Sequence, residues 1–139
     1  MAISFQTQLI EFKLSEKGKL KSWIKTVIES EKKKQGEINF VFTTDEEVLK
    51  ANVQFLKHNT YTDIITFDYC EGNIINGDII ISIQRVEENA EKFKTDFKTE
   101  LKRVIIHGIL HLCGYKDKSE NDIAIMRSKE NSALKKYPE

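Results

Sequence analysis

This sequence lacks most of the features that mark a secreted, membrane-bound or fibrous protein. Its 139 residues include one proline and two cysteines, Cys70 and Cys113, which are too few for a disulfide framework. No apolar run approaches the roughly 20 residues of a membrane-spanning helix, and the first residues lack the basic and apolar regions of a signal peptide. We therefore expect no membrane association and a location in the cytoplasm.

The sequence also lacks net charge, because 22 basic residues balance 22 acidic ones. This balance excludes a protein that coats nucleic acid by bulk positive charge, although it leaves room for a local basic face. One segment, residues 16–34, carries seven lysines and three glutamates. It is either the solvated face of a helix or a contact surface for a polyanion.

The pattern of apolar residues predicts a single domain over residues 1–139 in which strands and helices are interleaved. Strands are expected at 3–8, 37–43, 62–69 and 77–83. Helices are expected at 15–34, after Thr44, and at 84–97, 99–113 and 121–136, with Ser15, Thr44 and Thr99 as caps. This order indicates the α+β class, with a mixed sheet of about four strands and helices packed on it.

One segment, HGILHLCGYKDK at residues 107–118, combines residue types that suggest chemistry. The helix that contains its first half is apolar nearly all round, which predicts a buried central helix. His107 and His111 stand four residues apart, so they lie on the same helical face. Gly114 is suited to end the helix and turn the chain back, so that Asp117 reaches the same point. The spacing matches the ligand layout of zinc peptidases, except that this chain has an aspartate where those enzymes have a third histidine. It predicts a metal site at the helix end.

The alternative is a buried helix whose two histidines find ordinary hydrogen bonds, followed by a charged surface turn. A peptidase of this layout has a glutamate directly after the first histidine as general base, whereas this chain has Gly108 there. A glycine costs a helix roughly 1 kcal/mol, which suggests a close approach of other backbone. Cys113 lies roughly 200° round the helix from His111 and should point away from the site. The residues alone therefore favour a hydrolytic metal site without selecting its substrate.

The same segment carries a resemblance to a known family. HGILHLCGYKD, residues 107–117, is similar to the pattern H-G-x-L-H-L-x-G-Y-D-H of the YbeY family of metal-dependent endoribonucleases. TDIITF at 62–67 and GDI at 77–79 resemble two further stretches of that family. The resemblance implies a hydrolase that acts in ribosomal RNA maturation and ribosome biogenesis. Single-stranded ends of ribosomal RNA are the expected substrate, and proteins of the small ribosomal subunit are expected partners.

The resemblance implies that His107, His111 and Asp117 hold zinc or another divalent metal. This chain departs from the family pattern at Asp117, which replaces a histidine ligand, and at Leu56, which replaces a functional arginine. Lys57 is adjacent and is the candidate for the missing positive charge at the reacting phosphate, although a lysine lacks the guanidinium fork.

Two other functions remain open at this point. One is a small metallopeptidase of zincin-like layout, which the missing glutamate argues against. The other is a ribosome-associated binding protein whose metal is structural. Closed coordination would then require a fourth protein ligand, for which Glu120 and Asp122 are the candidates.

Overall fold

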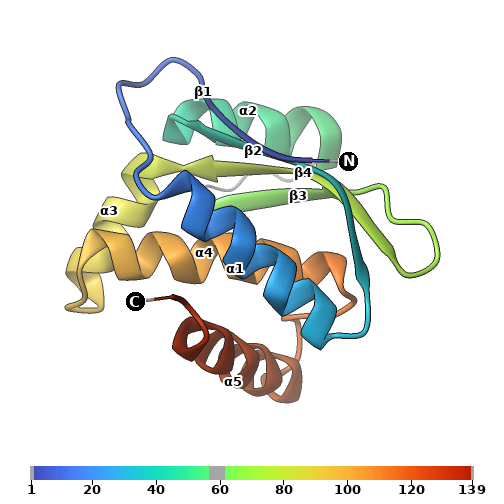
Figure 1. The fold of residues 1–139 in the computed structure, drawn as a ribbon. Helices are drawn as coiled ribbons and strands as arrows, with labels where there is room; N and C mark the ends of the chain where they lie inside the picture. Colours follow the sequence, from blue (N-terminus) through green and yellow to red (C-terminus); the bar gives the residue numbers. More distant parts are fainter. Residues whose placement is uncertain (1, 57–61, 139) are drawn as a thin grey trace.

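The computed structural model describes residues 2–56 and 62–138. Within these ranges the elements follow one another in the order β1-α1-β2-α2-β3-β4-α3-α4-α5 (Figure 1). The strands are β1 (Ile3–Thr7), β2 (Lys34–Thr43), β3 (Ile64–Asp68) and β4 (Ile74–Ser82). The helices are α1 (Lys17–Ser30), α2 (Asp45–Leu56), α3 (Ile83–Lys92), α4 (Phe97–Leu112) and α5 (Glu120–Lys135). None of these described helices is both long and apolar enough to cross a lipid bilayer.

The four strands form one mixed sheet in the order β1-β2-β4-β3. Strands β1 and β4 both run parallel to β2, while β3 is antiparallel to β4. In Figure 1, α2 lies on one face of the sheet and α1 and α4 lie on the other, with α5 on the far side of α4. The predicted α+β class and mixed four-stranded sheet are confirmed. Helix α4 is apolar nearly all round because it is enclosed between the sheet and other helices.

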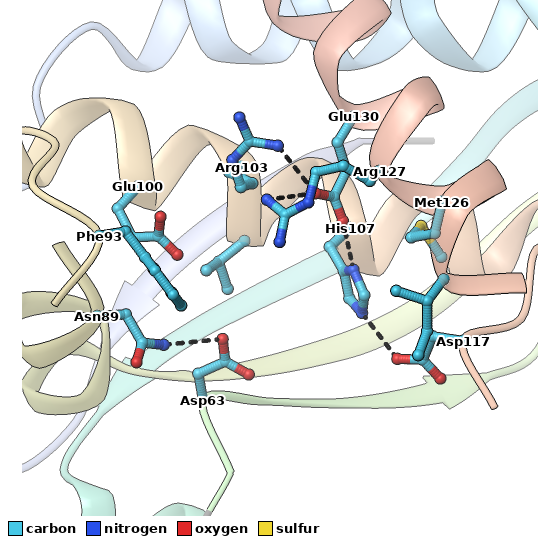
Figure 2. A pocket seen from close by; sticks show the side chains of 12 residues that line it. Asp63, Asn89, Phe93, Glu100, Arg103, His107, Asp117, Met126, Arg127 and Glu130 are labelled. Carbon is cyan, nitrogen blue, oxygen red and sulfur yellow. Dashed lines mark hydrogen bonds and ion pairs between the residues drawn. The ribbon is translucent and has the colours of Figure 1, made fainter. Parts of the chain in front are cut away.

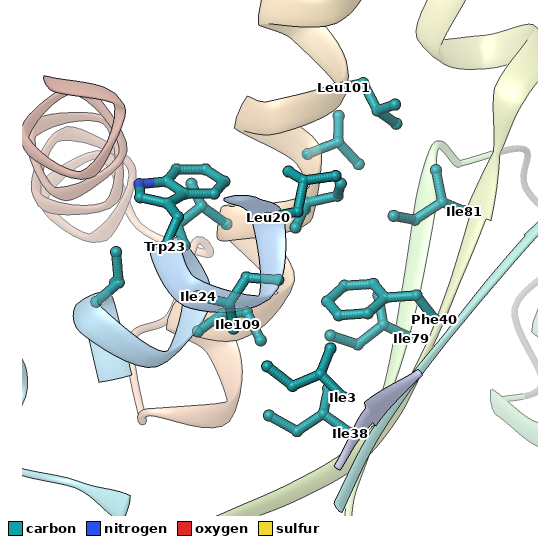
Figure 3. Close-up of a cluster of buried hydrophobic side chains, with 14 of the residues drawn as sticks. Ile3, Leu20, Trp23, Ile24, Ile38, Phe40, Ile79, Ile81, Leu101 and Ile109 are labelled. Atoms are coloured by element: carbon teal, nitrogen blue, oxygen red, sulfur yellow. The ribbon is translucent and has the colours of Figure 1, made fainter. Parts of the chain in front are cut away.

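The main hydrophobic core lies between the sheet and helices α1 and α4 (Figure 3). Alternate residues of a strand point to the same face, so Ile38 and Phe40 of β2 enter the core beside Ile79 and Ile81 of β4. Helix α1 buries the stripe expected from its sequence, which consists of Leu20, Trp23, Ile24, Val27 and Ile28. This packing fixes the position of α4 on the sheet.

Gly108 lies where α4 comes close to the sheet. A Cβ atom at this position would lie 2.9 Å from Cδ1 of Ile64 and 3.1 Å from Cδ1 of Ile79. Carbon atoms normally pack about 3.5–4.0 Å apart, so a larger residue would push α4 away from β3 and β4. A close approach does occur at this glycine, but its partners are isoleucine side chains of the sheet and not the other backbone that was expected.

The expected start and end of the first helix are both wrong, whereas the cap of the second is right. Helix α1 begins after Glu16, which has a left-handed φ of 60°, so Ser15 is not its cap. The helix stops at Ser30 because the chain must turn before β2 begins. Thr44 does cap α2, since its Oγ1 accepts a hydrogen bond from the Glu47 N–H at 3.2 Å.

The segment between α3 and α4 also differs from the prediction. A helix was expected to run to residue 97, with Thr99 as the cap of the next one, but α3 ends at Lys92 and α4 begins at Phe97. Asp96 is the cap, because its side chain accepts a hydrogen bond from the Thr99 N–H at 2.8 Å. Asp and Thr are both good cap residues, and the sequence alone did not distinguish them.

Trp23 joins α1 to α5. Its Nε1 donates a buried hydrogen bond of 2.7 Å to the carbonyl oxygen of Ala133. Trp23→Phe removes this donor and leaves the carbonyl with its second hydrogen bond alone, which the Lys136 N–H donates at 3.0 Å. We expect the free energy of unfolding to fall by about 0.5–1.5 kcal/mol, the net contribution of one hydrogen bond, as measured by urea denaturation followed by circular dichroism.

Gly18→Ala is the control for this variant, because Gly18 is exposed in the same helix and an added Cβ meets nothing within 4 Å. Alanine should raise the free energy of unfolding by about 0.5–1 kcal/mol. A Trp23→Phe protein as stable as the parent would show that the bond to Ala133 does not stabilise the packing of α5.

Candidate metal centre

The segment singled out in the sequence brings three side chains together. His107 and His111 lie in the last turns of α4. Gly114 has a φ of 108°, a left-handed conformation that favours glycine, and it reverses the chain after the helix as expected. The loop that follows carries Asp117 back to the two histidines. The structure thus places the three predicted residues in one cluster.

The ligand atoms of this cluster form a nearly regular triangle. Nε2 of His107 lies 3.0 Å from Nε2 of His111 and 3.3 Å from Oδ2 of Asp117, and the last two atoms are also 3.3 Å apart. Atoms bound to a tetrahedral zinc at about 2.0–2.1 Å are roughly 3.3 Å apart. The triangle therefore fits one face of such a site. One divalent ion at the centre could bind the lone pairs of all three atoms at once. A proton shared in a hydrogen bond would join only two of them.

The loop that carries Asp117 is held by a hydrogen-bond network. Tyr115 donates to Oε1 of Glu31 at 2.6 Å, and Lys129 of α5 donates to Oε2 of the same carboxylate at 3.3 Å. Glu31 directly follows α1. The loop is therefore fastened to both flanking helices, which limits the movement of Asp117 relative to the histidines.

The cluster contains three potential ligands, with no fourth among residues 2–56 and 62–138. Asp122 is engaged elsewhere, because its carboxylate accepts a hydrogen bond from the Ser119 N–H in the capping box of α5. Glu120 is exposed and lies outside the cluster. Asp117 is itself 43% exposed, so solvent reaches the triangle. Three protein ligands with an open position are typical of catalytic rather than structural zinc sites.

Glu130 of α5 orients His107. Its side chain is only 5% exposed, and Oε2 lies 2.7 Å from Nδ1 of His107 (Figure 2). The other oxygen accepts a hydrogen bond from Arg103 at 3.0 Å. An ionised carboxylate can only accept, so Nδ1 carries the proton and Nε2 offers its lone pair to the triangle. This is the usual arrangement of a metal-binding histidine. In the sequence, Glu130 is one acidic residue among several, and its distance from His107 along the chain carries no signal.

Burial and charge act in opposite directions on this pair. Burial alone lowers the pKa of His107, but the hydrogen bond and charge of Glu130, with smaller contributions from Asp117 and Asp63, raise that pKa above its ordinary value. Burial raises the pKa of Glu130, but His107 and Arg103 together hold it below its ordinary value. Glu130 therefore remains an ionised acceptor for His107.

A pocket of about 350 Å³ opens beside His107 and Asp117, between α3, α4 and α5 (Figure 2). Its volume lies in the range of small-molecule sites. Met126 is 2% exposed and belongs to both the core and the pocket wall. Arg127 also lines the pocket, and its side chain is 55% exposed with Nη1 3.5 Å from Glu130. The triangle thus lies at one end of a space large enough for a ligand.

The remaining sequence candidates are not part of the cluster. Lys57, the candidate for the missing positive charge, lies outside the described residues. Cys113 packs against the core as expected, and burial raises the pKa of its thiol to about 12. A thiol with so high a pKa does not form the thiolate that a metal ligand requires. Cys70 is likewise a free cysteine.

The role of Glu130 leads to a prediction about metal affinity. In Glu130→Gln, the amide can donate to Nδ1 of His107, which leaves the proton on Nε2 and removes a ligand lone pair from the triangle. We expect divalent-metal affinity to fall by about 10- to 100-fold, as measured by competition with a chelator. Glu120→Gln, which removes a charge from the exposed start of the same helix, should leave the affinity unchanged. Equal affinities for Glu130→Gln and the parent would contradict an orienting role.

Comparison with known proteins places this site in a family. Residues 3–138 match the family model described as Endoribonuclease YbeY. An endoribonuclease YbeY of Flavobacterium psychrophilum is 53% identical over 135 residues, which cover 97% of this chain and 96% of the relative. That of Parabacteroides distasonis is 50% identical over 139 residues, or 100% of this chain and 98% of the relative. A solution structure from Thermotoga maritima has a TM-score of 0.70 at 29% identity, over 98% of this chain and 89% of the other. The chain therefore belongs to the endoribonuclease YbeY family.

Proposed function

We propose that this protein is a metal-dependent endoribonuclease that cleaves single-stranded ribosomal RNA during ribosome maturation. The observation that carries the proposal is the triangle of His107, His111 and Asp117 at one end of a pocket, in a chain of the endoribonuclease YbeY family. Zinc is the first candidate for the ion. Two imidazoles and one carboxylate also suit other divalent metals.

The protein groups around the triangle have distinct roles in this proposal. His107, His111 and Asp117 would hold a divalent ion, which would supply Lewis acidity for activating water or polarising a phosphate oxygen. Glu130 holds the neutral His107 ring in the tautomer with its proton on Nδ1, which leaves the Nε2 lone pair for the ion. Arg127 presents an exposed guanidinium to the pocket, where it can bind phosphate oxygens. Lys57 is proposed for the same neutralisation of charge and lies outside the described residues.

Single-stranded RNA suits this site because unpaired bases can be turned out and bound, whereas those of a duplex are stacked and paired. The pocket beside the triangle has room for one unpaired nucleotide. The cytoplasm is the proposed location, which agrees with the free state of Cys70 and Cys113. Proteins of the small ribosomal subunit are proposed as partners on the family resemblance alone.

The two other functions receive no support from the site. A zincin-like peptidase needs a glutamate after the first histidine, and Gly108 at that position is packed against Ile64 and Ile79. A structural metal needs closed coordination, and the described residues supply three ligands to the cluster.

The proposed function predicts one divalent ion per chain and an activity that depends on it. The purified protein should contain about one ion and should cleave a single-stranded oligoribonucleotide but not casein. A chelator should abolish cleavage, and added metal should restore it. Elemental analysis of the His107→Ala/His111→Ala double variant should show loss of the ion, while Lys116→Ala, at an exposed position of the adjoining loop, should retain it. Equal metal contents in the double variant and the parent would rule out this site.

Asp117 allows a separate prediction about the identity of the metal. Asp117→His should retain the ion and shift the preference towards zinc, because three imidazoles form a softer set of ligands. Asp117→Ala should lower metal affinity by at least the roughly 10- to 100-fold that loss of an outer hydrogen-bond partner costs. Chelator competition with zinc and manganese measures both effects. If Asp117→Ala binds metal as tightly as the parent, the third ligand is a different residue.

A further inference from the structure

The end of the pocket away from the ligand triangle has a different character. Two carboxylates, Asp63 and Glu100, line it together with Asn89 and the ring of Phe93. Figure 2 shows both carboxylates directed towards the space beside this ring. Carboxylates repel phosphate groups, so this end of the pocket suits an uncharged part of a ligand that donates hydrogen bonds.

Glu100 has little exposed surface, and it lines the pocket. The residue is 5% exposed, and no group in the described part of the chain forms a hydrogen bond or ion pair with its carboxylate. Arg103 contributes a favourable charge, but its guanidinium is bonded to Glu130 and Asn131 instead. Burial raises the pKa of Glu100 above its ordinary value. Its oxygens are not sealed from solvent, because the described residues include no buried side-chain oxygen without a hydrogen-bond partner. A ligand in the pocket that Glu100 lines can therefore donate hydrogen bonds to them.

Asp63 and Phe93 line the same end of the pocket as Glu100. Oδ2 of Asp63 accepts a long hydrogen bond of 3.4 Å from Nδ2 of Asn89, and a carboxylate oxygen can accept more than one hydrogen bond. Phe93 follows the last residue of α3 and is 57% exposed. Unpaired bases stack on aromatic rings of this kind in proteins that bind single strands.

We propose that this end of the pocket is a subsite for a guanine base of the RNA substrate. The inference rests on the proposed nuclease function and names the base of the RNA that the pocket binds. Guanine fits because its Watson–Crick edge has two adjacent donors, N1–H and the 2-amino group, which match the two oxygens of a carboxylate. Adenine and cytosine place an acceptor nitrogen beside their amino group, and uracil has one donor between two acceptors. Each of these bases would bring a lone pair against a carboxylate oxygen.

Binding of mononucleotides tests the subsite independently of cleavage, because they contain no internucleotide bond. Metal-loaded protein is titrated with guanosine 5′-monophosphate (GMP) and inosine 5′-monophosphate (IMP), which lacks only the 2-amino group, and binding is followed by NMR. GMP should bind about tenfold more tightly, as expected for one hydrogen bond to a charged group. Equal affinities, or no GMP binding at millimolar concentration, would overturn the inference.

Three variants identify the residues responsible. Glu100→Gln keeps the side-chain size but exchanges an acceptor oxygen for a donor, and should abolish the preference for GMP over IMP. Glu87→Gln removes the same charge from an exposed position on α3 and should leave the preference intact. Phe93→Ala should weaken GMP and IMP equally, by about tenfold, because stacking does not depend on the 2-amino group. Glu100→Gln with an unchanged preference, or Phe93→Ala with unchanged affinities, would count against the subsite.

Cleavage assays separate this inference from the proposed function. An oligouridine with a single guanosine should be cut next to that guanosine, and replacement of the guanosine by inosine should slow the cut. A protein that cuts all single strands alike and binds GMP and IMP equally is a nuclease without the subsite. A protein that prefers GMP but cuts no RNA has the guanine site without the nuclease activity.

Discussion

The hydrogen bond between Glu130 and His107 is the interaction on which the site depends. A buried carboxylate is tolerated only when donors and positive charge surround it, and here His107 and Arg103 supply them at 2.7 and 3.0 Å. The same bond decides which nitrogen of His107 carries the proton. Helix α5 therefore orients His107 in the triangle, although none of the three triangle residues belongs to α5. The site as a whole is built from two helices, α4 and α5, and the loop between them.

The rest of the structure holds the two ends of that bond in place. On one side, α4 is fixed on the sheet by its apolar surface, and Gly108 allows the close approach to Ile64 and Ile79. On the other side, α5 is held by the bond from Trp23 to Ala133. The loop between them is fastened to Glu31 by Tyr115. The core thus acts on the site by setting the distance between two helices.

The sequence was informative where geometry is local. Four residues of helix fix the relation of His107 to His111, and a glycine turn fixes the return of Asp117, so these three could be found from spacing alone. Residues that reach the site only through the packing of distant segments have no recognisable spacing in the sequence. Glu130 and Glu100 resemble ordinary surface acids in the sequence, yet in the folded chain they are only 4% and 5% exposed.

Helix boundaries were less predictable because neighbouring residues compete for the same role. Asp96 and Thr99 can both cap a helix, and only the folded chain shows that Asp96 accepts from the Thr99 N–H. The strands were easier, since alternation of apolar residues reports directly which face is buried. Their order in the sheet, β1-β2-β4-β3, depends on contacts between distant segments and had no counterpart in the linear pattern.

The position of Glu130 in the last helix has a consequence for the timing of activity. The ribosome makes the chain from its N-terminus, so His107, His111 and Asp117 all leave the ribosome before the residue that orients the first of them. Until α5 has been made and has docked on α4, the nascent chain carries the three candidate ligands but lacks the carboxylate that bonds to Nδ1 of His107. In an endoribonuclease of this family, the cluster therefore acquires its orienting carboxylate only after the last helix has been made.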